Sequence, residues 1–253
     1  MNRSLHCLGT AGYHPNQRRH TSCYFLPRDG LLLDAGSGLF RCFDLLRTDT
    51  LHVLLSHAHL DHVCGLTFLW NAVRARPGIQ IHVWVHGDTL GPLRAHLFSH
   101  PLFPPEPAIE WHVLPADGEL ELPGIAAVRC FPLEHPGGST GYRIDWPDRS
   151  LAYVTDTACG PDDDYWEIVR DADLLVHECN FRADQAAFAA KTGHTDLGSL
   201  LRCLDRHRPK RVLLTHFNPL DDDLELEVRR GLEAIGGSPM RLELAADERV
   251  VEF

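Results

Sequence analysis

Long apolar runs are missing from this sequence of 253 residues. No stretch of eighteen apolar residues occurs, although a membrane-spanning helix needs about that length. The first residues, MNRSLHCLGTAGYHP, lack the apolar core and the small-residue cleavage site of a secretory signal. We therefore expect a cytoplasmic protein with no membrane partner.

Closely paired cysteines are also missing. The eight cysteines are scattered without any CxxC spacing: Cys7, Cys23, Cys42, Cys64, Cys130, Cys159, Cys179 and Cys203. This pattern favours reduced thiols, buried as small apolar side chains, over a disulfide framework. A structural zinc site held by sulfur is not expected.

Basic segments are short, and the formal net charge is −11 with histidine neutral. Such a surface offers little general attraction to a phosphate backbone. A long nucleic acid is therefore an unfavourable partner, and we expect a small-molecule substrate.

The chain has no linker, low-complexity tract or charged tail. With 44% hydrophobic residues it is long enough to bury a core. We expect one compact domain over residues 1–253. The oligomeric state is not readable from the sequence, and a homodimer is compatible with it.

Short apolar runs with β-branched residues recur and predict strands. These runs are GLLLDAG, HVLLSH, IQIHVWVH, AAVRCFPLEH, RSLAYVTD, DLLVHE, RVLLTH, MRLELA and RVVEF. Helical periodicity predicts helices over residues 61–74, 88–98, 162–171, 184–191, 195–207 and 222–235. The class is therefore mixed α/β. The Pro-rich segment HPLFPPEP, residues 100–107, is expected to be a loop and a candidate lid.

Histidine is abundant, with 17 residues, and most of them are expected to be ordinary surface or strand residues. This group includes His52, His82, His86, His112 and His207. Others follow directly after apolar runs, as does one aspartate: His57, His135, Asp156, His177 and His216. The carboxyl ends of strands commonly carry the chemistry of a fold, so these five ends can build one site.

The stretch LLSHAHLDHVCG, residues 54–65, concentrates four metal-binding side chains. Alternate residues of an extended segment point the same way, so His57 and His59 can reach one cation. Asp61 and His62 follow at a turn and can face a second cation. Imidazole and carboxylate together suit zinc, manganese or iron, and the lack of thiolates argues against a closed structural zinc site. The stretch predicts a dinuclear metal centre; a solvated polar loop is the alternative.

The HxHxDH pattern resembles the signature of the metallo-β-lactamase superfamily, and the resemblance extends over nearly the whole chain. It implies an αββα sandwich of two mixed sheets with helices outside. The ligands it implies are His57, His59 and His135 for one metal, Asp61, His62 and His216 for the other, and Asp156 bridging both. The resemblance also implies two divalent cations, expected to be zinc, with manganese and iron as alternatives.

Within that superfamily, the segments LGTAGYHPNQRRHTSCYFL, LLLDAG, TDTA, HEC, GHTD and LTHF look like the branch of ribonuclease Z and related phosphodiesterases. The HEAT and GHST segments of that branch correspond here to His177-Glu178-Cys179-Asn180 and Gly193-His194-Thr195-Asp196. The resemblance assigns His194 to phosphate binding or leaving-group protonation, with Glu178 as its partner. A polar pair at a strand end is the alternative for His177 and Glu178.

Two departures bear on the substrate. The long, basic, glycine-rich arm of ribonuclease Z has no counterpart, and the segment between Asp156 and His177 is short and acidic. Phosphodiesterases of the phosphonate-degradation type, which cleave a cyclic ribosyl phosphate, are closer in length and share a His-Pro element like His100-Pro101. Their cysteine-rich zinc site is absent, so the substrate stays open.

Two cations about 3.5 to 4 Å apart can share a water and lower its pKa toward about 7, which makes a bridging hydroxide the expected nucleophile. Asp61 is a catalytic candidate because it can orient this water or accept its proton. His194 would then protonate the leaving oxygen. Asp34 is a candidate for fixing the tautomer of a ligand imidazole. A simple turn aspartate before glycine is the alternative for this residue. Arg19 is expected in a surface salt bridge, with roles in the loop of residues 10–20 or at the substrate as alternatives.

The leading function is metal-dependent hydrolysis of a small phosphodiester, either linear or cyclic. Its rivals are transfer-RNA 3′ processing, hydrolysis of a lactone, thioester or sulfate ester by the same metal pair, and a metal-loaded binding or oxygen-sensing module. The last needs no leaving-group acid such as His194, which favours an enzyme.

Overall fold

The computed structural model describes residues 3–103, 105–122, 124–234 and 240–253. The chain divides into two compact units, each described here by itself. Unit 1 comprises Met1–Asp117 and Ala246–Phe253, and unit 2 comprises Gly118–Ala245. The expectation of a single domain over residues 1–253 stays a prediction.

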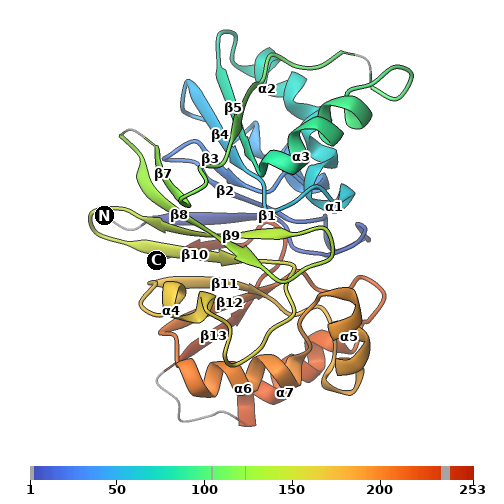
Figure 1. The fold of residues 1–253 in the computed structure, drawn as a ribbon, viewed down its shortest axis with the longest axis vertical. Helices are drawn as coiled ribbons and strands as arrows, with labels where there is room; N and C mark the ends of the chain where they lie inside the picture. Colours follow the sequence, from blue (N-terminus) through green and yellow to red (C-terminus); the bar gives the residue numbers. More distant parts are fainter. Residues whose placement is uncertain (1–2, 104, 123, 235–239) are drawn as a thin grey trace. The chain divides into compact units, whose positions relative to one another are not determined.

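Unit 1 contains a mixed sheet of seven described strands in the order β14-β1-β2-β3-β4-β5-β6 (Figure 1). The strands are β1 (Ser4–Gly9), β2 (Cys23–Leu26), β3 (Leu31–Leu33), β4 (Thr50–Leu54), β5 (Gln80–Val85), β6 (Glu110–Val113) and β14 (Val250–Glu252). Pairing is antiparallel from β14 to β3 and parallel from β3 to β6. The carboxyl ends of β3, β4 and β5 therefore lie at one edge of the sheet.

Helical segments cover one face of this sheet (Figure 1). They are η1 (Ser37–Cys42), α1 (Leu60–Val63), η2 (Cys64–Leu69), α2 (Trp70–Ala75), α3 (Gly87–Pro92) and η3 (Leu93–Leu97). Their apolar side chains, such as Leu39 and Leu66, pack with Val53 and Val83 of the strands. Period-2 alternation in the strands and helical periodicity beside them place these apolar side chains in one core.

Unit 2 contains a second mixed sheet of seven described strands in the order β13-β12-β11-β10-β9-β8-β7. The strands are β7 (Glu119–Leu122), β8 (Ala126–Leu133), β9 (Ser139–Asp145), β10 (Ser150–Val154), β11 (Leu174–Glu178), β12 (Arg211–Thr215) and β13 (Arg241–Leu244). Pairing is antiparallel from β7 to β10 and parallel from β10 to β13. Strands β10, β11 and β12 therefore deliver their carboxyl ends to one edge.

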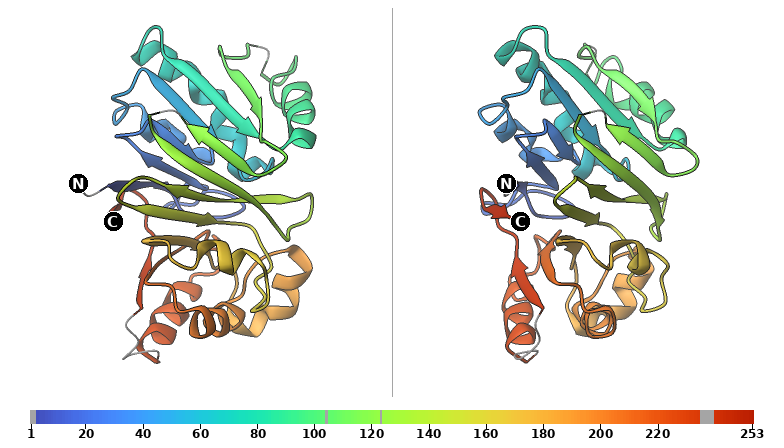
Figure 2. Two further views of the ribbon diagram at one scale, coloured as in Figure 1. Left: turned by 60° about the vertical axis from the view of Figure 1, so that its left-hand side comes forward. Right: turned by 90° about the vertical axis from the view of Figure 1, so that its left-hand side faces the viewer.

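Helices also cover one face of this second sheet. They are α4 (Tyr165–Val169), η4 (Ala183–Gln185), α5 (Ala186–Thr192), α6 (Leu197–His207) and α7 (Leu224–Ala234). Figures 1 and 2 show α6 and α7 lying side by side on this face. Leu200 and Leu204 of α6 pack with Leu175 of β11 and Leu214 of β12. Two mixed sheets with helices packed against them confirm the predicted fold class.

Every predicted strand and helix is present, but several strands were not predicted: β1, β2, β6, β7 and β9. The predicted helix over 61–74 is divided into α1, η2 and α2, and that over 88–98 into α3 and η3. Residue 235, the last of the predicted helix over 222–235, lies outside the described residues. The described part of the Pro-rich segment 100–107 contains no helix or strand, as expected. Its role as a lid stays a prediction.

All eight cysteines are free thiols, which confirms that expectation. Among the described residues, no helix has both the length and the apolar character to cross a bilayer.

Candidate metal centre

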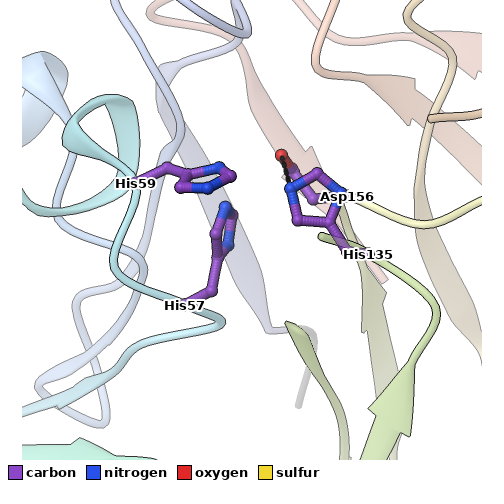
Figure 3. Close-up of side chains that lie close together, drawn as sticks. All are labelled: His57, His59, His135 and Asp156. Carbon is purple, nitrogen blue, oxygen red and sulfur yellow. Dashed lines mark ion pairs between the residues drawn. The ribbon is translucent and has the colours of Figure 1, made fainter. Parts of the chain in front are cut away.

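In unit 1, the HxHxDH stretch follows β4 and leads into α1. The imidazoles of His57 and His59 lie side by side with ring centroids 4.5 Å apart (Figure 3). The ring of His62 lies 4.3 Å from that of His57, and its Nε2 is 3.4 Å from Asp61 Oδ2. The structure therefore gathers all four predicted ligands of this stretch into one group.

Asp34 fixes the orientation of the His62 imidazole through its Nδ1 atom. Its Oδ2 lies 2.8 Å from His62 Nδ1, and both groups are fully buried. Ser56 donates its backbone N–H to Asp34 Oδ1 at 2.7 Å, and its hydroxyl lies 3.0 Å from His57 Nδ1. Because Nδ1 faces Asp34, Nε2 is the nitrogen of His62 that faces Asp61 and would bind a cation. Asp34 was predicted in this role; Ser56 was not, although it immediately precedes His57.

Two glycines allow the stretch to pack this closely. A Cβ on Gly65 would lie 2.3 Å from the carbonyl oxygen of Gly36, and a Cβ on Gly36 would lie 2.4 Å from that of Asp61. Any larger residue would separate α1 from the turn after β3. The glycine that follows HxHxDH is thus a packing requirement of the motif.

The loop of residues 10–20 contacts the same group of side chains. The backbone N–H of Tyr13 donates to Asp61 Oδ2 at 2.7 Å. Arg19 is buried, and its guanidinium donates to Thr10 Oγ1, so the expectation of a surface salt bridge for Arg19 was wrong. Its side chain instead supports the loop that contacts Asp61.

In unit 2, three predicted ligands converge. Asp156 Oδ1 lies 3.1 Å from His216 Nε2, and Asp156 Oδ2 lies 3.8 Å from His135 Nε2 (Figure 3). His135 donates from Nδ1 to the carbonyl oxygen of Gly193 at 2.8 Å, which makes Nε2 the ring nitrogen with the acceptor lone pair. One carboxylate thus turns each of its oxygens toward a different imidazole.

Asp34, Asp156 and His216 share an unusual backbone. Their φ angles are 57°, 44° and 56°, in the left-handed region that residues with a side chain seldom adopt. All three follow strand ends. Such conformations persist where the surrounding structure requires them, and they cluster at functional sites.

His194 lies beside these ligands on the loop between α5 and α6. Its Nδ1 is 3.2 Å from Glu178 Oε1 and 4.0 Å from Asp156 Oδ2. Glu178 is fully buried and accepts the backbone N–H groups of Thr157 at 2.6 Å and Thr195 at 3.2 Å. The predicted pairing of His194 with Glu178 is therefore present. Asp156, His194 and His216 also offer ligand atoms within 4.8 Å of one another, so a ligand role is the geometric alternative for His194.

His177 does not join this group, which corrects the idea that five strand ends build one site. Successive residues of a strand face opposite ways, so His177 points away from Glu178. Its Nδ1 donates to the carbonyl oxygen of Glu178 at 2.8 Å, and Tyr165 donates to its Nε2 at 3.0 Å. Burial lowers the pKa of His177. The residue is a neutral histidine of the core.

Asn180 is a site residue that the sequence reading missed. Its amide nitrogen lies 3.0 Å from His216 Nδ1 and donates to the His216 carbonyl oxygen at 2.9 Å. It occupies the fourth position of the segment that replaces HEAT, two residues after Glu178. Its proximity to that carboxylate in sequence is the one signal that could have identified it.

The fold and these two groups of imidazole and carboxylate ligands define a metallo-β-lactamase fold protein. The model of the Beta-lactamase superfamily domain matches residues 31–217, and the chain belongs to this family. The family predicted from the motifs is thereby confirmed.

The chain is also similar to three individual proteins. It is 27% identical to a ribonuclease Z of Halobacterium salinarum, over 83% of this chain and 85% of that protein. The metallo-β-lactamase fold protein YhfI of Bacillus subtilis has a TM-score of 0.81 at 21% identity, with 100% of both chains covered. A diphosphatase of the PhnP family has a TM-score of 0.75 at 20% identity, covering 100% of this chain and 98% of that one. The two structural similarities show the fold.

Proposed function

We propose that this protein is a dinuclear metal-dependent hydrolase that cleaves a small phosphodiester, either linear or cyclic. The observation that carries the proposal is the His194–Glu178 pair in unit 2. It supplies a proton-carrying imidazole in addition to the predicted ligands. Two of the three similar proteins are named as a ribonuclease and a diphosphatase, which supports hydrolysis at phosphorus over a binding or oxygen-sensing module.

In this proposal seven side chains hold two divalent cations. One cation is held by His57, His59 and His135, the other by Asp61, His62 and His216, and Asp156 is shared. Each unit supplies imidazoles and carboxylates without thiolates, a donor set that fits zinc, manganese or iron. When bound, the cations supply Lewis acidity to the phosphoryl group and lower the pKa of water. We propose zinc as the resident metal.

The chain's own residues position and move the protons. Asp34 and Ser56 hold His62 and His57 in fixed orientations. Asp61, fixed by the Tyr13 N–H, orients the attacking water or accepts its proton. Glu178 holds Nδ1 of His194, so Nε2 is the atom that donates a proton to the leaving oxygen.

A small substrate is favoured over transfer RNA by charge. The net charge is −11, and the segment between Asp156 and His177 carries the acidic run Asp162–Asp164 in place of a basic arm. Binding of long RNA depends on neutralising many phosphates with basic side chains. The named ribonuclease Z relative keeps transfer-RNA 3′ processing as the second candidate.

The test is a substrate panel on zinc- or manganese-reconstituted protein. The panel comprises bis(p-nitrophenyl) phosphate, cyclic nucleotides, a lactone and precursor transfer RNA. We expect turnover of the phosphodiesters, its loss in Asp156→Ala, and no change in His96→Ala, an exposed control position in unit 1. Turnover of the lactone alone would overturn the proposal, and cleavage of precursor transfer RNA at its 3′ side would establish the second candidate instead.

A further inference from the structure

A second cluster of histidines lies in unit 1, on strands that supply no ligand of the proposed centre. Strand β6 is the edge strand of its sheet and pairs in parallel with β5. In this register His82 is opposite Glu110, and Trp84 is opposite His112. Paired residues, and residues two apart, share one face of a sheet, so all four side chains lie on the same face.

The ligand-type atoms of this cluster converge on one point. His82 Nδ1 lies 2.9 Å from His112 Nε2. The two carboxylate oxygens of Glu110 lie 3.5 Å from His82 Nδ1 and 3.4 Å from His112 Nε2. Ligands of tetrahedral zinc at about 2.0 to 2.1 Å are about 3.3 to 3.4 Å apart, so only the two imidazoles need to separate slightly.

Stacking holds both imidazoles in this orientation. The ring of Trp84 stacks on His112 at 4.2 Å, and the ring of His52 stacks on His82 at 4.9 Å. The indole N–H of Trp84 donates to His52 Nδ1 at 3.3 Å, which engages His52 outside the cluster. The rings are therefore preorganised by neighbours that are not ligands.

The cluster is also accessible and suited to a cation. The side chains of His82 and His112 are 17% and 24% exposed, and that of Glu110 is 66% exposed. Two imidazoles and one carboxylate, with solvent to complete the coordination, match the ligand preferences of zinc.

We propose that His82, Glu110 and His112 form a further zinc site, which ties the edge strand β6 to β5. Among the described strands, β6 has a neighbour on one side only. Bound zinc would link it to β5 through side chains as well as backbone hydrogen bonds. The competing explanation is that His82 and His112 form a hydrogen bond between their imidazoles and bind no zinc.

The first test counts zinc in the full chain. After zinc loading and removal of excess metal, we expect wild type to hold one zinc per chain more than His112→Gln. The control His86→Gln changes an exposed histidine just beyond β5 and should match wild type. Equal zinc contents in wild type and His112→Gln would overturn the proposal.

The second test is hydrogen exchange of the β6 amides. With free zinc at about ten times the Kd, opening that requires zinc release should slow about tenfold in wild type and not in His112→Gln. Unchanged exchange in wild type would refute the tie between the strands. Turnover of bis(p-nitrophenyl) phosphate should be the same in both proteins, so failure of the proposed hydrolase would abolish turnover in both without altering the zinc difference.

Discussion

At the scale of single residues, the candidate centre depends on side chains that fix other side chains. Asp34 holds His62, Glu178 holds His194 and Asn180 contacts His216. Each partner is itself buried. Replacing Asp34, Glu178 or Asn180 should therefore change the orientation of the imidazole that this residue contacts without removing the imidazole itself.

Replacing His194 can distinguish a role as general acid from a role as metal ligand. Replacing His194 by alanine should leave the metal content unchanged and slow cleavage by about 10²- to 10⁴-fold for an alkoxide leaving group, the range for losing a general acid. The loss should be much smaller for p-nitrophenolate, which needs little protonation. Steady-state kinetics with both substrates and elemental analysis measure the two effects.

His96→Ala is the matched control, because this histidine is exposed and lies in α3–η3 of unit 1. Loss of a metal in His194→Ala would make His194 a ligand. An equal slowing for both leaving groups would assign it to phosphate binding.

The lowered pKa of His177 predicts how the free energy of unfolding depends on pH. Its folded pKa lies below the unfolded value of about 6.5, so the unfolded chain binds more protons below that pH. The free energy of unfolding should therefore fall as pH drops below about 6.5, by at most about 1.4 kcal/mol per pH unit from this residue. Urea unfolding of wild type and His177→Asn between pH 8 and pH 5 measures this fall in the free energy of unfolding. The two curves should converge toward low pH, and parallel curves would contradict the prediction.

At the scale of helices and strands, strongly patterned segments were predictable and weakly patterned ones were not. RVLLT and SLAYV are continuous apolar runs and form β12 and β10. By contrast, β9 contains Gly141 and four polar residues, and the edge strand β6 alternates Glu110 and His112 with apolar residues. These strands form because their neighbours in the sheet complete their backbone hydrogen bonds, a tertiary effect that a local pattern does not contain.

Helix α6 offers a test at this scale. Its N-cap residue, Asp196, accepts the backbone N–H of Ser199 at 3.0 Å and is 4% exposed. Asp196→Ala should lower the free energy of unfolding by about 0.5 to 2 kcal/mol. Asp205→Ala, at the exposed end of the same helix, should change it by no more than about 0.5 kcal/mol. Denaturant unfolding compares them, and equal losses would show that the cap is not the cause.

At the scale of the whole molecule, the sequence revealed the site where its residues are contiguous. His57, His59, Asp61 and His62 stand within six positions, so alternation and the following turn were enough to predict their grouping. The later ligands are dispersed between residues 135 and 216, and the family resemblance was needed to assign them.

The β5–β6 histidines escaped sequence reading for a different reason. His82 and His112 are thirty residues apart, and β6 itself was not predicted. Their contact depends on the register between two strands, which no local pattern specifies.

The central claim is that the seven predicted ligands together hold two cations, with Asp156 shared between them. The most direct measurement is the metal content of unchelated protein carrying His112→Gln, which removes the proposed β5–β6 site from the count. About two divalent metals per chain are expected, and adding Asp156→Ala should lower metal content and turnover together. No bound metal, with no uptake of added zinc or manganese, would contradict the account, as would full occupancy and normal turnover after Asp156→Ala.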